Sequence, residues 1–248
     1  MPHPARQRVI DELRDRLKQW ESPRRATGAI VSSGYAALDR LLPEGGFRRG
    51  GLVECLEPAA GSGAGTLALA AATRATGQAL RESTAGAGPL VVVDGQGEFY
   101  PPAAALAGID LERLILVEPR NRQDQAWVWD QALRCPGVGA VLGWIGNFNQ
   151  RTRRRWQLAA EAGAGLGLLI CPASIRDEPC WAQVRLLVQP LVSSHVSPPG
   201  RRVRIELLRA ASVATGVIVE LDLEDETRDV HLDSPLATGA AVRRSARA

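Results

Sequence analysis

Hydrophobic residues in the middle of the chain form short continuous runs, and segments of helical length separate them. Strand-like segments rich in Leu and β-branched residues occur at 52–56, 90–93, 114–117, 138–145 and 166–170. The runs 90–93 and 114–117 are apolar without interruption, whereas 52–56 contains Glu54. Helical patterns occupy 66–79, 125–134 and 150–162. Runs that are apolar throughout are typical of strands buried on both faces. Strands that alternate with helices indicate right-handed βαβ units and a parallel sheet.

The pattern changes after Cys171. Three strand-like runs, 184–188, 203–208 and 217–221, follow one another with turn-rich stretches and no helical segment between them. Consecutive strands without helices are typical of antiparallel pairing. We therefore predict a three-layer α/β fold whose central sheet is mainly parallel, with antiparallel strands at its C-terminal end.

The two ends of the chain differ from this core. The first twenty residues have the spacing of an amphipathic helix, whose apolar positions include Val9, Leu13, Leu17 and Trp20. We predict three parts: a helix and linker at 1–28, a core at 29–236 and a flexible basic tail at 237–248. The helix is a candidate for binding another subunit or a partner. Packing as a cap on its own domain is an equal alternative.

Composition is that of an ordinary globular protein: 248 residues, 45% hydrophobic and 23% charged. No apolar run approaches the roughly 18 residues of a membrane span, and the N-terminus is charged from its start. The four cysteines are too far apart for C-x-x-C pairs, and the three histidines are isolated. We therefore expect a cytoplasmic protein without a metal site and without a His-based catalytic triad.

A small-residue loop lies between the first long strand and the helix that follows it, where α/β proteins usually bind phosphate. Its central residues are Gly61, Ser62, Gly63, Ala64, Gly65 and Thr66. A P-loop needs a lysine directly after its last glycine, to reach the β- and γ-phosphates. The residue after each candidate glycine is Ala64 or Thr66, and the only lysine of the chain is Lys18. Taken alone, the loop also fits a simple glycine-rich turn.

Two other parts of a nucleotide-hydrolysing site are also missing. The strand 138–145 lies where a Walker-B strand would end in aspartate, but it offers Gly143 and Trp144, and neither can bind Mg²⁺. Gln96 follows the run 90–93, where a catalytic carboxylate would lie, and an amide cannot accept a proton from water. Phosphoryl transfer depends on these charges. We therefore predict a protein without ATPase activity, without catalytic residues and without a cofactor.

Several segments together resemble the core of RecA-type proteins. Residues 31–39 contain a Ser-Gly-x-x-x-Leu-Asp motif, and 45–54 contain a Gly-Gly pair followed by Gly-Leu-Val-Glu. Residues 94–101 resemble the next strand end of that core, with Gln96 where the family has its catalytic glutamate. Residues 107–114 resemble the stretch that follows. The resemblance spans roughly residues 30 to 225 and implies a RecA-like fold.

Within the RecA superfamily, the missing lysine and the segments 154–161 and 203–209 are similar to the ImuA family, also described as SulA-like. This resemblance implies an accessory role in error-prone translesion DNA synthesis, as part of induced mutagenesis in the SOS response to DNA damage. The implied partners are an ImuB-type Y-family-like protein and, through it, an error-prone replicative-type DNA polymerase. RecA and single-stranded DNA are further candidate partners, in a nucleoid-associated location. The alternative is a nucleotide-dependent DNA-binding ATPase of the RecA superfamily with an atypical P-loop.

A cluster of arginines follows the strand that ends near Trp144. The candidate DNA or partner contacts are Arg151, Arg153, Arg154, Arg155 and Trp156. Arginines can bind phosphate oxygens while a tryptophan stacks on a base. The alternative is a solvated helix face with Trp156 or Leu158 in the core. Since the net charge is only +3, we expect DNA binding at this cluster to be weak and strongly salt-dependent.

Overall fold

The computed structural model describes residues 29–77, 88–191, 201–210 and 215–223. The predicted N-terminal helix with Val9, Leu13, Leu17 and Trp20, and the predicted tail 237–248, lie outside the described residues.

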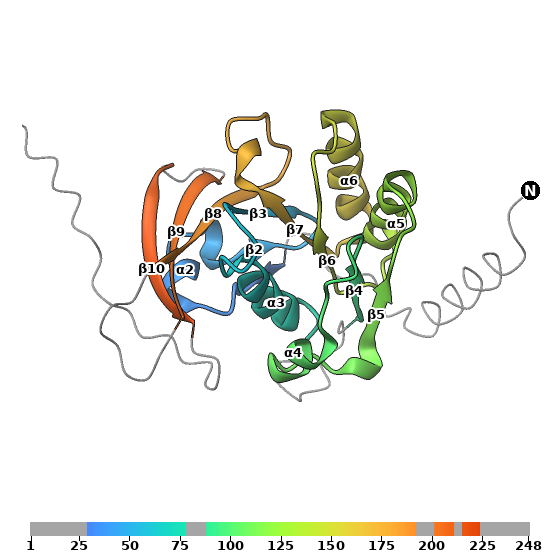
Figure 1. Ribbon diagram of the computed structural model, residues 1–248, viewed down its shortest axis with the longest axis horizontal. Helices are drawn as coiled ribbons and strands as arrows, with labels where there is room; N and C mark the ends of the chain where they lie inside the picture. Colours follow the sequence, from blue (N-terminus) through green and yellow to red (C-terminus); the bar gives the residue numbers. More distant parts are fainter. Residues whose placement is uncertain (1–28, 78–87, 192–200, 211–214, 224–248) are drawn as a thin grey trace, which may run out of the picture.

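One large sheet forms the centre of the described part of the chain (Figure 1). Its strands are β3 (Leu52–Glu57), β4 (Leu90–Val93), β5 (Leu114–Val117), β6 (Ala140–Trp144), β7 (Leu166–Pro172), β8 (Val184–Leu191), β9 (Arg201–Ala210) and β10 (Val217–Leu223). They lie in the order β10-β9-β8-β3-β7-β6-β4-β5. Pairing is parallel from β8 to β5, and β8, β9 and β10 pair antiparallel. The predicted mainly parallel sheet with antiparallel strands at its C-terminal end is confirmed.

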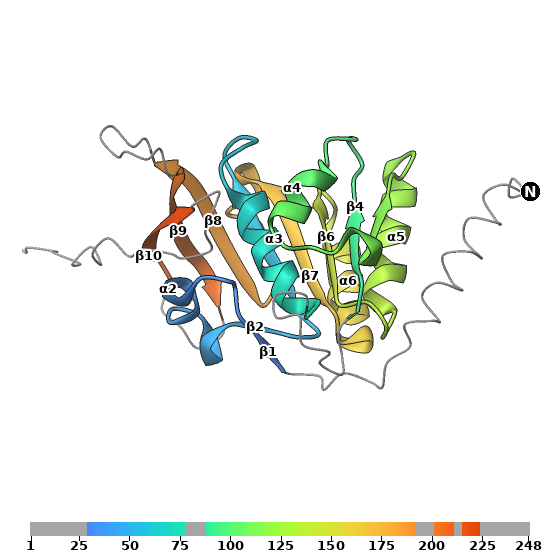
Figure 2. The same ribbon diagram turned by 90° about the horizontal axis from the view of Figure 1, so that it is seen from below.

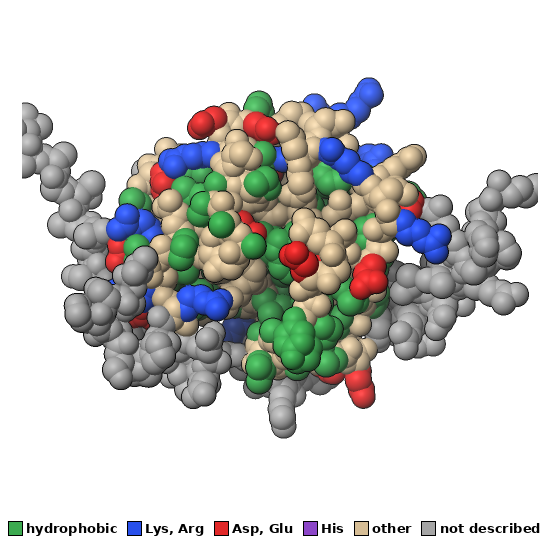
Figure 3. Space-filling view, in the orientation of Figure 1, with side chains coloured by type: hydrophobic (Ala, Val, Ile, Leu, Met, Phe, Trp, Pro, Cys, Tyr) green, Lys and Arg blue, Asp and Glu red, His purple; other side chains and the backbone are tan. Residues whose placement is uncertain are grey.

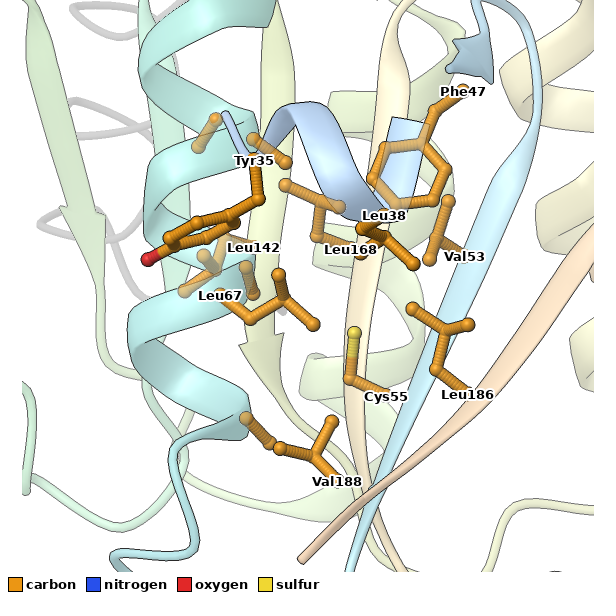
Figure 4. Packing of buried hydrophobic residues seen from close by; sticks show 14 of the residues in the cluster. Tyr35, Leu38, Phe47, Val53, Cys55, Leu67, Leu142, Leu168, Leu186 and Val188 are labelled. Atoms are coloured by element: carbon orange, nitrogen blue, oxygen red, sulfur yellow. The ribbon is translucent and has the colours of Figure 1, made fainter. Parts of the chain in front are cut away.

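Helices cover both faces of this sheet (Figure 2). On one face, α3 (Ala64–Ala75) packs its buried alanines and Leu67 on alternate residues of β3, Val53 and Cys55. Figure 4 shows this packing from close by. On the other face, α5 (Arg122–Arg134) and α6 (Gln150–Gly163) pack on Leu52 and Leu56 of the same strand. The successive side chains of β3 therefore enter two cores, which explains why the strand is mostly apolar; Glu54 is the buried exception.

The helix starts depend on caps that the hydrophobic pattern does not show. The side chain of Asn121 accepts a hydrogen bond from the backbone N–H of Asp124, and that of Asn149 accepts one from Thr152. Asparagine is a preferred N-cap residue. As a result α5 begins at Arg122, three residues before its predicted start, whereas α6 begins at Gln150 as predicted.

The shortest elements were not predicted. They are α2 (Ala36–Asp39), α4 (Pro101–Leu106) and the antiparallel pair β1 (Ile30–Val31) and β2 (Phe47–Arg48). β1 and β2 have two residues each, and α2 and α4 have fewer than two helical turns, so none of the four shows a periodic pattern. No helix in the described ranges has the length and apolar character needed to cross a membrane.

Candidate functional site

The predicted nucleotide loop connects β3 to α3 and is folded back on itself. Gly61 and Gly63 have positive φ angles of 81° and 97°, which glycine adopts without strain. Between them, the buried Ser62 donates its hydroxyl to the carbonyl oxygen of Ala59, and its backbone N–H donates to the same oxygen at 3.3 Å. The serine hydroxyl therefore closes the loop from inside.

The position of the P-loop lysine is occupied by a buried methyl group. Gly63 is the N-cap of α3, so Ala64 is the first residue of the helix and follows the last glycine of the loop. Its side chain is fully buried. A Cβ atom on Gly63 would lie 2.7 Å from Val203 and 3.2 Å from Leu223. Apolar side chains of strands β9 and β10 therefore pack directly against the loop. Ala64 cannot supply the charge that the γ-phosphate requires.

Aromatic and aliphatic side chains occupy the region where a P-loop protein would bind Mg²⁺. The ring of Trp144 lies 3.5 Å from where a Cβ of Gly65 would be, and Ile170 lies 3.9 Å from the same point. Phe99 packs beside this indole, with 6.4 Å between the ring centroids. In a P-loop protein a hydroxyl and a carboxylate hold Mg²⁺ in this region. Within the described ranges, no three His, Cys, Asp or Glu side chains gather as a metal site.

Gln96 is exposed on a turn that Asp94 organises. The carboxylate of the buried Asp94 accepts hydrogen bonds from the backbone N–H groups of Gln96 at 3.1 Å, Gly97 at 2.8 Å and Phe99 at 2.7 Å. Burial opposes ionisation of this carboxyl, but the backbone donors outweigh it and hold the pKa of Asp94 below its ordinary value. Asp94 is therefore a structural anion that orders the loop beside the site.

We expect Asp94→Asn to lower the free energy of unfolding by about 2 kcal/mol at pH 7, because an amide nitrogen cannot accept these hydrogen bonds. The pKa of Asp94 is lowered by folding, so its contribution exists above the unfolded pKa and disappears as the pH falls through the folded pKa. Urea unfolding of both proteins between pH 7 and pH 2 measures this. The exposed Glu98→Gln is the control, and equal pH profiles for wild type and Asp94→Asn would contradict the assignment.

A buried charge cluster lies beside β3. It was not identified from the sequence. Glu54, Arg153 and Arg185 are each at most 2% exposed. Glu54 Oε2 lies 2.6 Å from Arg185 Nη2 and 2.7 Å from Arg185 Nε, and Glu54 Oε1 lies 3.4 Å from Arg153 Nη1. Arg153 also donates from Nε to the carbonyl oxygen of Phe148. Two cations and one carboxylate are thus enclosed between β3, β8 and α6.

The cluster also fixes the loop between β7 and β8. Nη1 of Arg185 donates to the carbonyl oxygens of Ile175, Arg176 and Glu178 at 3.2, 2.9 and 2.7 Å. The thiol of Cys180 donates to Glu54 at 3.3 Å. Burial, together with the negative charge of Glu54, raises the pKa of Cys180 to about 12. Cys180 is therefore a neutral hydrogen-bond donor and not a nucleophile.

The predicted arginine cluster does not form one surface. Arg151, Arg154 and Arg155 are exposed, whereas Arg153 is 1% exposed and Trp156 is fully buried. The prediction that Arg153 and Trp156 contact DNA or a partner is therefore wrong, because both side chains are buried, and Trp156 lies in the core as the alternative expected. Contact of Arg151, Arg154 and Arg155 with DNA or a partner stays a prediction. Residues 153, 156, 157 and 160 share one helix face, and this spacing could have identified the buried side.

Trp156 and the exposed arginines have separate surroundings. The indole of Trp156 packs between Trp129 and Phe148, and its Nε1 donates to the carbonyl oxygen of Ala126 at 3.1 Å. On the outer face, Arg155 pairs with Asp130 at 3.2 Å. Arg154 lies 4.8 Å over the ring of Trp181, which is 41% exposed. The arginine–tryptophan combination thus exists, but with Trp181 in place of Trp156.

A hollow of about 660 Å³ lies between the first turns of α5 and α6. Arg122 lies at its rim, 4.6 Å over the ring of Phe148. This hollow is on the opposite face of the sheet from α3, so it is not part of the nucleotide loop.

Comparisons with known proteins agree with this architecture. RecA of Picosynechococcus sp. is 30% identical over 114 residues, which are 46% of this chain and 30% of that RecA. RecA of Streptomyces venezuelae is 34% identical over 113 residues, 46% of this chain and 28% of that RecA. The chain therefore matches less than a third of the length of these relatives. No family model matches it.

The fold has a close match among solved structures. A crystal structure of the RadB recombinase superposes with a TM-score of 0.61, covering 79% of this chain and 97% of that one, at 19% identity. At this identity the match shows the fold alone. The strand order, the partial RecA match and the RadB superposition agree on one conclusion: the chain has a RecA-like fold, and 46% of it shares homology with proteins of the RecA superfamily.

Proposed function

We propose that this protein is a non-catalytic RecA-like accessory factor of error-prone translesion DNA synthesis, acting as an adaptor in the response to DNA damage. The observation that carries the non-catalytic part is the buried Ala64 at the first position of α3. Catalysis of phosphoryl transfer is almost entirely positioning and charge stabilisation. Ala64, Gly65 and Trp144 provide neither a cation nor a ligand for Mg²⁺.

The adaptor part rests on the resemblance to the ImuA family. A RecA-like fold without its catalytic groups still offers rigid surfaces for docking, and several large apolar side chains are exposed on it. The proposed direct partner is an ImuB-type Y-family-like protein, which connects the adaptor to an error-prone replicative-type polymerase in the nucleoid. RecA and single-stranded DNA are secondary candidates.

Co-expression of the full chain with an ImuB-type Y-family-like protein tests the adaptor role. We expect the two proteins to co-purify at constant stoichiometry through affinity and size-exclusion steps. An unrelated Y-family polymerase serves as the control. Failure of the two proteins to associate, in cells or after mixing the purified proteins, would overturn the adaptor role.

The alternative is a nucleotide-dependent DNA-binding ATPase with an atypical P-loop, and one observation favours it. Gly61 and Gly63 keep left-handed conformations, which can turn successive backbone N–H groups toward an anion. We expect ATP with Mg²⁺ to leave the melting temperature unchanged and to release no phosphate above background. A reproducible rise in melting temperature, or steady ATP turnover by clean protein, would favour the alternative.

The exposed arginines allow a test of DNA binding that leaves the core intact. We expect replacement of Arg151, Arg154 and Arg155 by Ala to weaken single-strand binding. The plot of log affinity against log salt concentration has a negative slope. This slope should become less steep by about 0.7 for each phosphate that the variant no longer neutralises. Fluorescence anisotropy with a labelled oligothymidine at several salt concentrations measures this. Arg153 is left unchanged because its replacement would disturb the buried cluster.

The matched control replaces Arg201, Arg113 and Arg40, which lie on other elements. Unchanged affinity and slope in the α6 variant would remove DNA contact from this helix.

A further inference from the structure

The most exposed apolar surface of the described residues lies on α4 (Figure 3). Leu106 is 84% exposed, Tyr100 is 66% exposed, and Leu111 just after the helix is 43% exposed. Pro102 and Ala103 are exposed between them. We call these five residues the α4 surface. Figure 3 shows hydrophobic side chains gathered where α4 lies in Figure 1. Large apolar side chains grouped in this way usually mark a binding surface.

The surroundings of the α4 surface are acidic. Glu98 precedes α4, and Asp110 and Glu112 follow it, all with exposed side chains. Arg113 is the one basic residue between positions 98 and 113. The surface therefore fits a segment that has an apolar stripe and a positive net charge.

The start of the described chain and α4 are both connected to the end of α3. The carbonyl oxygen of Ala29 accepts a hydrogen bond from the backbone N–H of Arg49, whose guanidinium donates to the carbonyl oxygen of Ala75. The hydroxyl of Thr73 donates to the carbonyl oxygen of Ala107 at 3.3 Å. Ala29 is thus connected to the last turn of α3 through Arg49, and the end of α4 contacts the same turn through Thr73. The eight residues 21–28 can span up to about 26 Å, which is enough to bring the preceding segment onto α4.

The sequence before Ala29 has the required chemistry. Residues 1–28 contain seven basic and four acidic residues, and the stripe Val9, Leu13, Leu17 and Trp20 recurs at helical spacing. The segment 78–87 also connects to the end of α3, but its only large apolar residue is Leu80. Of these two segments, only the N-terminal one can cover the α4 surface.

We propose that residues 1–20 pack their apolar stripe on the α4 surface of the same chain. The short linker makes this an intramolecular contact with a high effective concentration, so it does not depend on protein concentration. The proposal is independent of the proposed function, because it concerns neither the nucleotide loop nor the partner protein.

Hydrogen exchange on the full chain tests the contact from the α4 side. We expect the amides of residues 9–20 to exchange at least tenfold faster in Leu106→Glu than in wild type, because an exposed carboxylate replaces the apolar contact. Leu106 is already solvent-exposed on the described surface, so its replacement should leave the core folded. Leu158→Glu, at a 53% exposed leucine of α6, is the matched control and should leave these rates unchanged. Equal rates for residues 9–20 in wild type and Leu106→Glu would overturn the proposal.

A disulfide distinguishes the same chain from a second copy. We expect oxidised Leu13→Cys/Leu106→Cys protein to contain a linked peptide pair within a monomer, whereas Leu13→Cys/Leu158→Cys remains unlinked. Non-reducing gels and peptide mass spectrometry measure this at several protein concentrations. A bond that joins two chains only would assign the surface to a second copy. Absence of any disulfide would show that residues 1–20 do not pack on the α4 surface. Both outcomes contradict the proposal.

Discussion

Glu54→Ala is expected to lower the free energy of unfolding by about 3–5 kcal/mol, the largest effect of any single substitution considered for this chain. Glu54 is the shared counterion of Arg153 and Arg185, and removing it leaves two buried cations without a carboxylate. Desolvated charges cost far more unpaired than paired. Since small domains have stabilities of roughly 5–15 kcal/mol, we expect a protein that is partly unfolded at 37 °C. Urea or thermal unfolding followed by circular dichroism measures the change.

A matched variant shows whether the loss of stability comes from burial of the carboxylate or from removal of any carboxylate. Arg176 and Glu206 form an ion pair at 2.7 Å that is partly exposed to solvent. Surface pairs contribute about 0–1 kcal/mol, so Glu206→Ala should change stability by no more than this. If Glu54→Ala does not fold, Glu54→Gln keeps an acceptor for Arg185 and should give an intermediate loss. A loss below 1 kcal/mol for both Glu54 variants would show that the cluster does not stabilise the fold.

Gly143→Ala is expected to cost about 3 kcal/mol, although it adds a single methyl group. A Cβ atom at this position would lie 2.3 Å from the carbonyl oxygen of Val93 and 3.3 Å from the ring of Trp129. Both neighbours belong to packed elements, so β6 and β4 would have to separate or Trp129 would have to move. Chemical denaturation of the two proteins gives the difference directly.

Gly146→Ala is the control, because a Cβ there meets nothing within 4 Å. We expect it to change stability by less than about 0.5 kcal/mol. The comparison also bears on the missing Walker-B carboxylate. If Gly143→Ala is destabilising, an aspartate at position 143 would meet the same contacts with Val93 and Trp129. Equal stabilities for the two alanine variants would show that the strand end is more tolerant than its geometry implies.

The parts of the fold that could be predicted are those whose signal is local. β4 and β5 have their predicted bounds to the residue, because both runs are apolar throughout and end where polar residues begin. β4 is buried on both faces as predicted, whereas β5 is a partly exposed edge strand. The residues at the motif positions, Ala64, Trp144 and Gln96, can be read directly from the sequence, but the lack of ATPase activity that they imply stays a prediction.

The charge cluster could not be predicted, because its members are brought together only by folding. Arg153 is 99 residues from Glu54 in the sequence, and Arg185 is 131 residues away. An arginine beside other arginines is normally exposed to solvent. The four arginines at 151–155 therefore gave no sign in the sequence that Arg153 is buried. The same applies to the filled magnesium region, where Trp144, Phe99 and Ile170 come from three separate segments.

The three carbonyl bonds of Arg185 have a consequence for recognition. They hold the loop between β7 and β8 in one shape, and that loop presents Trp181 beside Arg154. A ligand that binds this surface meets a loop that is already in its bound shape. Its association is therefore not slowed by rearrangement of the loop, and little entropy is lost in ordering it. Discrimination between ligands then depends on shape and charge that are already in place before the encounter.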